Sequence, residues 1–411
     1  MKNLNKLRKY AELAVKTGVN VQPGQMLVIT TTTDCKDFAR LVVEEAYKAQ
    51  AGYVFVRWSD DPITKITYEH ADVNVLKVVP DWIKNQYQYF MDQGACALNI
   101  YAPTPGLLAS VDPSKIQEVQ IEMQKALKSY REYMMGNKAQ WSLVSVPTEA
   151  WATKVFPEVS VEEAVEKLWD AILAAVRIED DNDPVKEWEE HNERLSTYNK
   201  KLNEYNFERL IFKNSLGTDL NVELVKGHHW AGGSEKAQNG VIFNPNLPTE
   251  ENFTMPKKTG VNGTVVATKP LNYQGRLIEE FTLTFKDGEV VSYTAKKEEG
   301  ALKNLLSVDE GSRYLGEVAL ISYHSPISLS NVLFYNTLFD ENASCHLALG
   351  RAYPMNIQGG NDMSEEELAA AGVNLSMEHV DFMFGSEDMS ILGVLANGQK
   401  VVVFDQGNFV I

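Results

Sequence analysis

Two residues that could do chemistry together lie near the end of the chain, in the segment EHVDFMFG at 378–385. The segment has the composition of a buried strand. Side chains two positions apart on a strand point to the same face, so His379 and Asp381 should project side by side. Burying an imidazole and a carboxylate costs free energy unless they are paired or bind a cation. The two residues could therefore be a simple hydrogen-bonded pair or one edge of a metal site.

Further acids and histidines in the second half lie in similar apolar or proline-bounded segments. Glu317 interrupts the apolar strand YLGEVALI, so we expect a buried carboxylate that needs a partner. His346 lies in DENASCHLALGRAYP, whose composition favours a short helix, and Glu250 and Glu251 lie between two prolines in NLPTEENFTMP. Taken alone, each residue has an ordinary explanation as a solvated carboxylate, a core histidine or part of a polar turn.

Taken together, these residues favour a bound cation. Two histidines and three or four carboxylates occur in one half of the chain, and a cation compensates several buried acids at once. Imidazole and carboxylate donors without thiolate suit Zn²⁺, Co²⁺ or Mn²⁺. The number of candidate ligands exceeds the three protein ligands of a typical catalytic zinc ion. They match two ions about 3.5–4 Å apart that share a carboxylate, which predicts a dinuclear site.

A tyrosine could join this site. Tyr353 lies seven residues after His346, so both side chains would point the same way if the predicted helix extended that far. A phenol there could donate a hydrogen bond to a developing oxyanion, and an aromatic plug at a helix end is the alternative. Cys345 should face away from His346 and is not expected to be a ligand. For His228 and His229, a solvated turn is the favoured interpretation. The other histidines have no acidic partner in view: His70, His191 and His324.

The elements that must position these residues differ between the two halves of the chain. The first third alternates helices and strands, which is typical of βαβ units and a mostly parallel sheet. A long charged helix is expected to begin at Asp183 and Pro184, and the sequence after it is rich in short strands with tight turns, such as KDGE at 286–289. We therefore expect an α/β N-terminal domain with a mostly parallel sheet, a connecting helix, and an α+β, strand-rich C-terminal catalytic domain, at 1–180, 181–206 and 207–411.

Bulk composition limits the partners and the compartment. The 411 residues carry a formal net charge of −17, which argues against nucleic acid or an anionic membrane surface as the main partner. No apolar stretch approaches the roughly 20 residues that span a bilayer, and the start of the chain lacks the apolar core of a signal peptide. The three cysteines form no CxxC pair. We expect a soluble, cytoplasmic protein.

At the residues named above, the chain resembles the family of metallo-aminopeptidases that includes aminopeptidase T, aminopeptidase S and PepS. The resemblance lies in PTEENFTMP, LGEVALI, SCHLALGRAYP and EHVDFMFGSED, which follow the family's order, and in the early segment YAELAVKTGVNVQPGQMLVI. It covers nearly the whole chain. It implies two domains, a homodimer, a cytosolic location and action on peptide N-termini. It also implies an active-site tyrosine at Tyr353, a bridging carboxylate at Glu317, and metal ligands at Glu250, Glu317, His346, His379 and Asp381.

The hypothesis is a dinuclear metal-dependent aminopeptidase that releases N-terminal amino acids from short peptides by attack of a metal-activated water. It would hold two divalent ions per subunit (zinc, cobalt or manganese), with Glu251 as general base and Tyr353 as oxyanion donor. Three alternatives stay open. The N-terminal sheet could bind a nucleotide, although it lacks a GxGxxG or GxxxxGK[ST] motif. The metal centre could cleave a phosphoester or another amide, or it could be purely structural.

Overall fold

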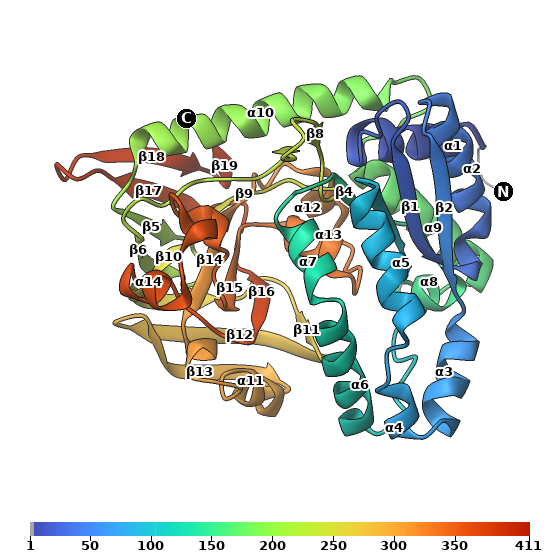
Figure 1. The fold of residues 1–411 in the computed structure, drawn as a ribbon. Helices are drawn as coiled ribbons and strands as arrows, with labels where there is room; N and C mark the ends of the chain where they lie inside the picture. The colour runs from blue at the N-terminus through green and yellow to red at the C-terminus, as the bar shows by residue number, and fades with distance from the viewer. Residues whose placement is uncertain (1–3, 103) are drawn as a thin grey trace. The chain divides into compact units, whose positions relative to one another are not determined.

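The structure is a computed structural model that describes residues 4–102 and 104–411 (Figure 1). Residues 1–3 and 103 of the predicted domain 1–180 therefore lie outside the described residues. The chain forms two compact units. The first contains Met1–Glu190 and Ser234–Pro248, and the second contains His191–Gly233 and Thr249–Ile411. The division falls inside helix α10 (Pro184–Tyr205), which is the helix predicted at 181–206. Asp183 caps α10, because its Oδ1 accepts a hydrogen bond of 3.0 Å from the Val185 N–H.

A parallel sheet with the strand order β2-β1-β3-β4 forms the centre of the first unit. Its strands are β1 (Met26–Thr32), β2 (Tyr53–Ser59), β3 (Cys96–Tyr101) and β4 (Trp141–Ser145). Besides the first part of α10, the α-helices of this unit are α1 (Leu4–Leu13), α2 (Lys36–Lys48), α3 (Asp61–His70), α4 (Val73–Leu76), α5 (Asp81–Asp92), α6 (Pro113–Ala126), α7 (Lys128–Met135), α8 (Glu149–Val155) and α9 (Val161–Ala175). The segment Ser234–Pro248 adds a small pair of strands, β7 (Glu235–Lys236) and β8 (Ile242–Phe243).

Helices lie on both faces of this sheet. One face buries apolar residues such as Leu27, Ile29 and Leu98, and α1 and α2 lie on that side (Figure 1). Helices α5 and α7 lie on the opposite side. There, Val28 and Phe90 belong to a smaller apolar cluster, against which Phe55 and Tyr87 pack. Burial on both faces is typical of parallel sheets and explains why β1 is apolar along most of its length.

A long antiparallel sheet forms most of the second unit, with the order β11-β12-β10-β6-β5-β17-β18-β19 and with β13 paired to β12. These strands are β5 (Arg209–Lys213), β6 (Asp219–Leu224), β10 (Pro256–Val266), β11 (Leu271–Tyr273), β12 (Arg276–Lys286), β13 (Glu289–Lys297), β17 (Ser390–Val394), β18 (Lys400–Asp405) and β19 (Asn408–Phe409). The predicted KDGE hairpin joins β12 to β13 through Asp287 and Gly288, which have φ angles of 49° and 87°, as a tight hairpin turn requires. The helices of this unit are the second part of α10, α11 (Glu299–Leu305), α12 (Pro326–Ser330), α13 (Thr337–Asp340) and α14 (Glu365–Ala370).

A smaller antiparallel sheet in the second unit carries the residues singled out for chemistry. Its order is β16-β15-β14-β9, and its strands are β9 (Asn252–Thr254), β14 (Leu315–Leu320), β15 (His346–Gly350) and β16 (His379–Met383). The strands predicted around Glu317 and around His379 are confirmed as β14 and β16. The short helix predicted over His346 is wrong, because 346–350 pairs with β14 on one side and β16 on the other. Leucine and alanine favour helix locally, but pairing inside a buried sheet overrides that preference.

The two units confirm the predicted fold class, with a parallel α/β sheet in the N-terminal part and a strand-rich C-terminal part. Among the described residues, no helix combines the length and the apolar character needed to cross a lipid bilayer.

Candidate metal centre

The register of the small sheet brings four of the predicted residues onto one face. Glu317 on β14 lies opposite Ala348 on β15, and Ala348 lies opposite Asp381 on β16. Glu317 and Asp381 therefore occupy one row across three strands. His346 lies two residues before Ala348, and His379 lies two residues before Asp381, so both histidines point to the same face as the two acids.

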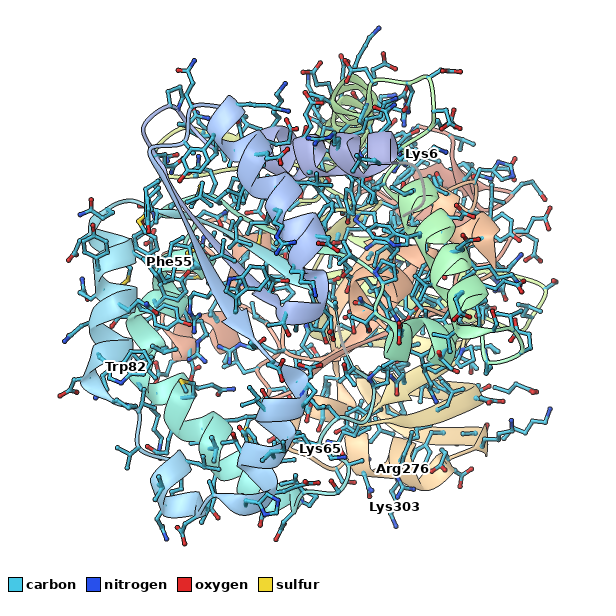
Figure 2. The ribbon with its side chains drawn as sticks, turned by 90° about the vertical axis from the view of Figure 1, so that its right-hand side faces the viewer. Lys6, Phe55, Lys65, Trp82, Arg276 and Lys303 are labelled. Atoms are coloured by element: carbon cyan, nitrogen blue, oxygen red, sulfur yellow. The ribbon has the colours of Figure 1, made fainter. Side chains whose placement is uncertain are left out.

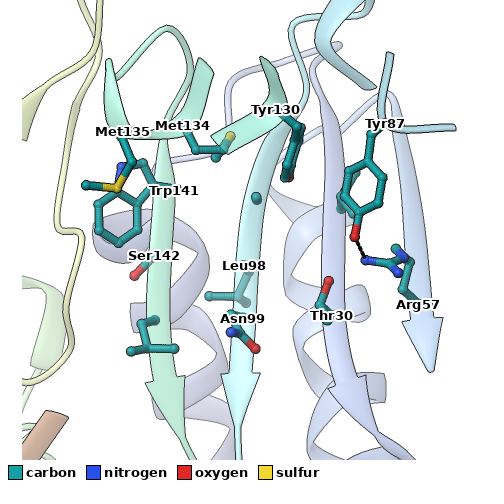
Figure 3. Close-up of a pocket in the computed structure, with 13 residues that line it drawn as sticks. Thr30, Arg57, Tyr87, Leu98, Asn99, Tyr130, Met134, Met135, Trp141 and Ser142 are labelled. Carbon is teal, nitrogen blue, oxygen red and sulfur yellow. Dashed lines mark hydrogen bonds between the residues drawn. The ribbon is translucent and has the colours of Figure 1, made fainter. Parts of the chain in front are cut away.

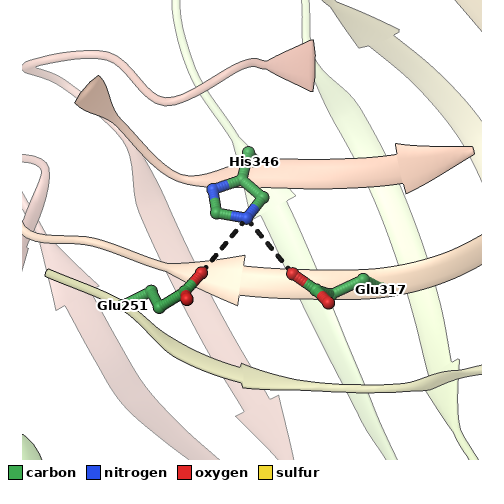
Figure 4. A group of neighbouring side chains, drawn as sticks. All are labelled: Glu251, Glu317 and His346. Atoms are coloured by element: carbon green, nitrogen blue, oxygen red, sulfur yellow. Dashed lines mark hydrogen bonds and ion pairs between the residues drawn. The ribbon is translucent and has the colours of Figure 1, made fainter. Parts of the chain in front are cut away.

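Glu251 joins these side chains from the residue just before β9, which pairs with β14. Its Oε2 lies 3.4 Å from His346 Nε2, and Glu317 Oε1 lies 3.2 Å from the same nitrogen (Figure 4). The other oxygen of Glu317, Oε2, lies 3.8 Å from His379 Nε2, and Asp381 Oδ1 lies 3.3 Å from that nitrogen. Two groups of three donors result, and they share Glu317: Glu251, Glu317 and His346 form one, and Glu317, His379 and Asp381 form the other.

The cluster is largely buried, and its charges act strongly on one another. The His346 side chain is 1% exposed and that of His379 is 17% exposed. Burial alone lowers the pKa of both histidines, but the surrounding carboxylates outweigh it and raise the pKa of His346 to about 9 and that of His379 to about 10. Burial raises the pKa of Glu251 to about 8. The charge of His346 lowers this pKa, and the charges of Glu317 and Asp381 raise it. Positive charge at this site is therefore favourable.

The donor atoms fit a divalent metal ion. Asp381 Oδ1 is buried and takes no hydrogen bond from any described residue, although it lies close to both histidines. His379 Nδ1 donates a hydrogen bond of 2.6 Å to the carbonyl oxygen of Arg351, which leaves Nε2 available as a ligand. Cys345 faces away, as predicted, because its Sγ accepts a hydrogen bond of 3.3 Å from the Ile321 N–H. Imidazole and carboxylate without thiolate is the donor set of Zn²⁺, Co²⁺ or Mn²⁺ sites.

Glu250, adjacent to Glu251, has different surroundings. Its Oε2 lies 3.7 Å from His191 Nε2 on α10, and its backbone N–H donates a hydrogen bond of 2.7 Å to Asn342 Oδ1. The two groups of close donors contain Glu251 and do not contain Glu250. His191 was expected to lack an acidic partner, and that expectation is wrong. Of the two adjacent glutamates, Glu251 is the one whose carboxylate lies among the close donor atoms.

Tyr353 lies beside the cluster for a reason that differs from the predicted one. It follows β15 in an extended conformation, so no helix continues to it from His346, and the argument from helical spacing is wrong. Its ring nevertheless lies 4.5 Å from the ring of His379. Burial raises the pKa of Tyr353, and the charges of Glu317 and Asp381 raise it further. The phenol therefore keeps its proton and can donate a hydrogen bond.

Glu341 is a partly buried carboxyl group at the cluster that the sequence analysis did not single out. Burial raises its pKa well above the usual range, and the charges of Glu251, Asp381 and Glu317 add to the effect. Glu341 and Asp381 both line a cavity of about 50 Å³, which is large enough for a water molecule. The sequence feature that could have identified Glu341 is its position in DENASCHLALG, directly before an apolar segment.

Comparison with known proteins identifies the family. Residues 3–409 match the family described as thermophilic metalloprotease, M29. The chain belongs to the M29 family of metalloproteases. The M29 match extends over both units.

Individual M29 relatives match over nearly their full length. The chain is 49% identical over 403 residues to Aminopeptidase 2 of Geobacillus stearothermophilus, covering 98% of this chain and 97% of that protein. It is 39% identical to Aminopeptidase T of Thermus aquaticus, covering 100% and 98%. The solved structure of wild-type AmpT from Thermus thermophilus matches with a TM-score of 0.91 at 37% identity, over 99% of both chains. These matches confirm the family resemblance and the prediction of a metallo-aminopeptidase.

Proposed function

We propose that this protein is a dinuclear aminopeptidase that releases N-terminal amino acids from short peptides. The observation that carries the proposal is the position of Glu317, whose two carboxylate oxygens face two different histidines. That arrangement divides the donors into two overlapping groups, as expected where one carboxylate bridges two ions. A single structural site would need only one closed group of four ligands.

The residues proposed to hold the ions are Glu251 and His346 on one side, His379 and Asp381 on the other, and Glu317 between them. Bound divalent ions would lower the pKa of water toward neutrality and polarise a carbonyl oxygen. The absence of thiolate donors supports zinc, cobalt or manganese. This assignment gives Glu251 the ligand role that the family resemblance had placed on Glu250.

The remaining polar groups at the cluster have roles that follow from their surroundings. Glu341 lines the small cavity next to Asp381, so we assign it the role of general base, in place of Glu251, which lies against His346. The same carboxyl group would return the proton to the departing amine. Tyr353 stays protonated beside His379 and would donate a hydrogen bond to the tetrahedral oxyanion.

The preference for short peptides, the oligomeric state and the compartment are parts of the same proposal. The buried donor side chains favour a narrow, extended peptide end over a folded protein. A homodimer is supported by apolar side chains that the fold leaves at the surface, among them Ile63, Val75 and Trp82, which are 64%, 68% and 67% exposed. Trp82 is labelled in Figure 2. Three free, buried cysteines are consistent with a reducing cytoplasm.

The experiment that tests this proposal combines metal analysis with hydrolysis of leucine p-nitroanilide, before and after treatment with a chelator. We expect two divalent ions per chain, activity that disappears on chelation, and recovery on addition of Zn²⁺, Co²⁺ or Mn²⁺. N-acetyl-leucine p-nitroanilide is the control, since an aminopeptidase requires a free amine. Glu341→Gln should retain both ions and lose most of its kcat.

Three results would contradict the proposal. A single tightly bound ion with no effect of chelation on hydrolysis would indicate a structural site. Cleavage of p-nitrophenyl phosphate in preference to the anilide would indicate a phosphoesterase. Equal hydrolysis of the free and acetylated substrates would remove the requirement for an N-terminus.

A further inference from the structure

The parallel sheet of the first unit carries a row of polar side chains that the proposed function does not use. Arg57 on β2 pairs with Thr30 on β1, and Thr30 pairs with Asn99 on β3, so these three residues lie side by side across adjacent strands. Neighbouring strands are about 4.8 Å apart, so the row spans about 10 Å. Figure 3 shows the three side chains in this order.

The row lies where open α/β sheets usually bind ligands. In the order β2-β1-β3-β4 the chain passes from β1 to β2 on one side and returns to β3 on the other, so the strand order reverses between β1 and β3. Thr30 and Asn99 lie on these two strands, and each is two residues before the carboxyl end of its strand. Ligands of such folds bind near the carboxyl ends of the strands at this reversal.

A cavity of about 410 Å³ covers this row, and all its lining residues belong to the first unit. Its volume falls in the range of small-molecule sites, which is about 300–1,000 Å³. Apart from the polar row, the lining is mainly aromatic and apolar and includes Tyr87, Tyr130, Met134 and Trp141 (Figure 3). The cavity therefore has one polar wall and several apolar walls.

Arg57 supplies an uncompensated positive charge at one end of the row. Its Nη1 donates a hydrogen bond to the Tyr87 hydroxyl, and its guanidinium lies 4.8 Å from the centre of the Tyr87 ring. No carboxylate among the described residues forms an ion pair with it, although the chain carries 56 acids and only 39 lysines and arginines. The side chains of Thr30 and Asn99 form no hydrogen bond with any other described residue. All three residues retain hydrogen-bonding capacity toward the cavity.

We propose that this cavity binds a small carboxylate that carries an amide group and an apolar or aromatic side chain, the chemistry of an N-acyl amino acid or of the C-terminal residue of a peptide. Arg57 would hold the carboxylate, because a guanidinium fork matches two carboxylate oxygens. Thr30 and Asn99 lie further along the row, where they would hydrogen-bond the amide. Tyr130 and Trp141 would contact the side chain.

A nucleotide fits the cavity less well. A di- or triphosphate needs several cations or a run of backbone N–H groups, and the cavity lining contains one arginine and no other cationic side chain. A singly charged carboxylate is the better match to one guanidinium within an apolar wall.

The test uses calorimetric titration of the metal-loaded full chain with N-acetyl-L-phenylalanine and, separately, with its uncharged amide. We expect the acid to bind at least about tenfold more tightly than the amide, because a charge-assisted hydrogen bond is lost in the amide. Arg57→Gln should weaken binding of the acid by at least tenfold. Arg40→Gln, a change at an exposed arginine on α2 that pairs with Asp37, is the matched control and should leave the affinity unchanged.

A further arm separates this cavity from the metal centre. Glu317→Gln alters the proposed metal site and should leave the affinity for N-acetyl-L-phenylalanine intact, so failure of one proposal does not imply failure of the other. Three results would overturn the inference: equal affinities for the acid and the amide, full affinity in Arg57→Gln, or tighter binding of ADP than of the acid. The comparison of acid with amide uses the unmodified protein and stands even if Arg57→Gln fails to fold.

Discussion

Replacing Glu317 with glutamine should remove both metal ions, because this residue belongs to both donor groups. Each group has three donors, and the substitution leaves two, which is below the three protein ligands of a typical catalytic site. The lost charge is also large at this position. The distance from Glu317 Oε1 to His346 Nε2 is 3.2 Å. At an effective dielectric constant of about 20, a carboxylate and a unit positive charge at this separation attract each other by about 5 kcal/mol. Since about 1.4 kcal/mol is a factor of ten, kcat/KM should fall by at least about 10³-fold.

Two companion variants make this prediction specific. Asp381→Asn affects only the second group, so it should lower the metal content from two ions toward one, whereas Glu317→Gln should lower it below one. Glu378→Gln is a control for the chemical change, since Glu378 accepts a hydrogen bond from Tyr273 and belongs to neither donor group. Metal content is measured by plasma mass spectrometry and activity with leucine p-nitroanilide. A Glu317→Gln protein with two ions and an unchanged rate would refute the bridging role.

Three further predictions follow from the same geometry. Tyr353→Phe should lower kcat by about 10²-fold with metal content unchanged, as for loss of one oxyanion donor, and an unchanged kcat would exclude that role. In the metal-free protein the pKa values of His346 and His379 are about 9 and 10, above the ordinary value of 6.5. Protonation of the two histidines therefore stabilises the fold fully below about pH 6.5, and this stabilisation is lost as the pH rises through about 9–10. Metal binding must displace these protons, so metal affinity should rise with pH over this range. Calorimetric titration with the metal at a series of pH values measures this dependence, and an affinity that does not change with pH would contradict the assignment. Gly316→Ala should lower both the melting temperature and the metal content, because a Cβ atom there would lie 2.3 Å from the carbonyl oxygen of Arg351, and wild-type values for both would contradict the close packing.

The sequence predicted the elements that local patterns determine. The apolar run of β14 around Glu317 and the spacing of His379 and Asp381 on β16 were sufficient to place these residues on buried strands. The cap at Asp183 and the KDGE turn identified α10 and the β12–β13 hairpin in the same way. In each case the signal lies within a few consecutive residues.

Other features depend on contacts between distant segments, which one sequence does not encode locally. His346 lies on a strand only because β14 and β16 pair with it from both sides. Glu250 and Glu251 differ in surroundings that come from distant segments: Asn342 Oδ1 accepts a hydrogen bond from the Glu250 backbone N–H, and His191 Nε2 lies 3.7 Å from the Glu250 carboxylate. Glu250 and Glu251 precede β9 and lie outside any helix or strand, so side-chain periodicity does not predict which of the two faces the cluster.

The hydrogen bond that orients His379 has a main-chain acceptor, the carbonyl oxygen of Arg351. The N–H of the same residue donates to the carbonyl oxygen of Glu378, so pairing of the two backbones sets the ring's tautomer and tilt. No exchange of the side chain at position 351 deletes that acceptor. Substitutions of the side chain at position 351 should therefore leave the orientation of the His379 ring unchanged. Only a change that moves the backbone, such as an insertion in the loop after β15, would alter that orientation.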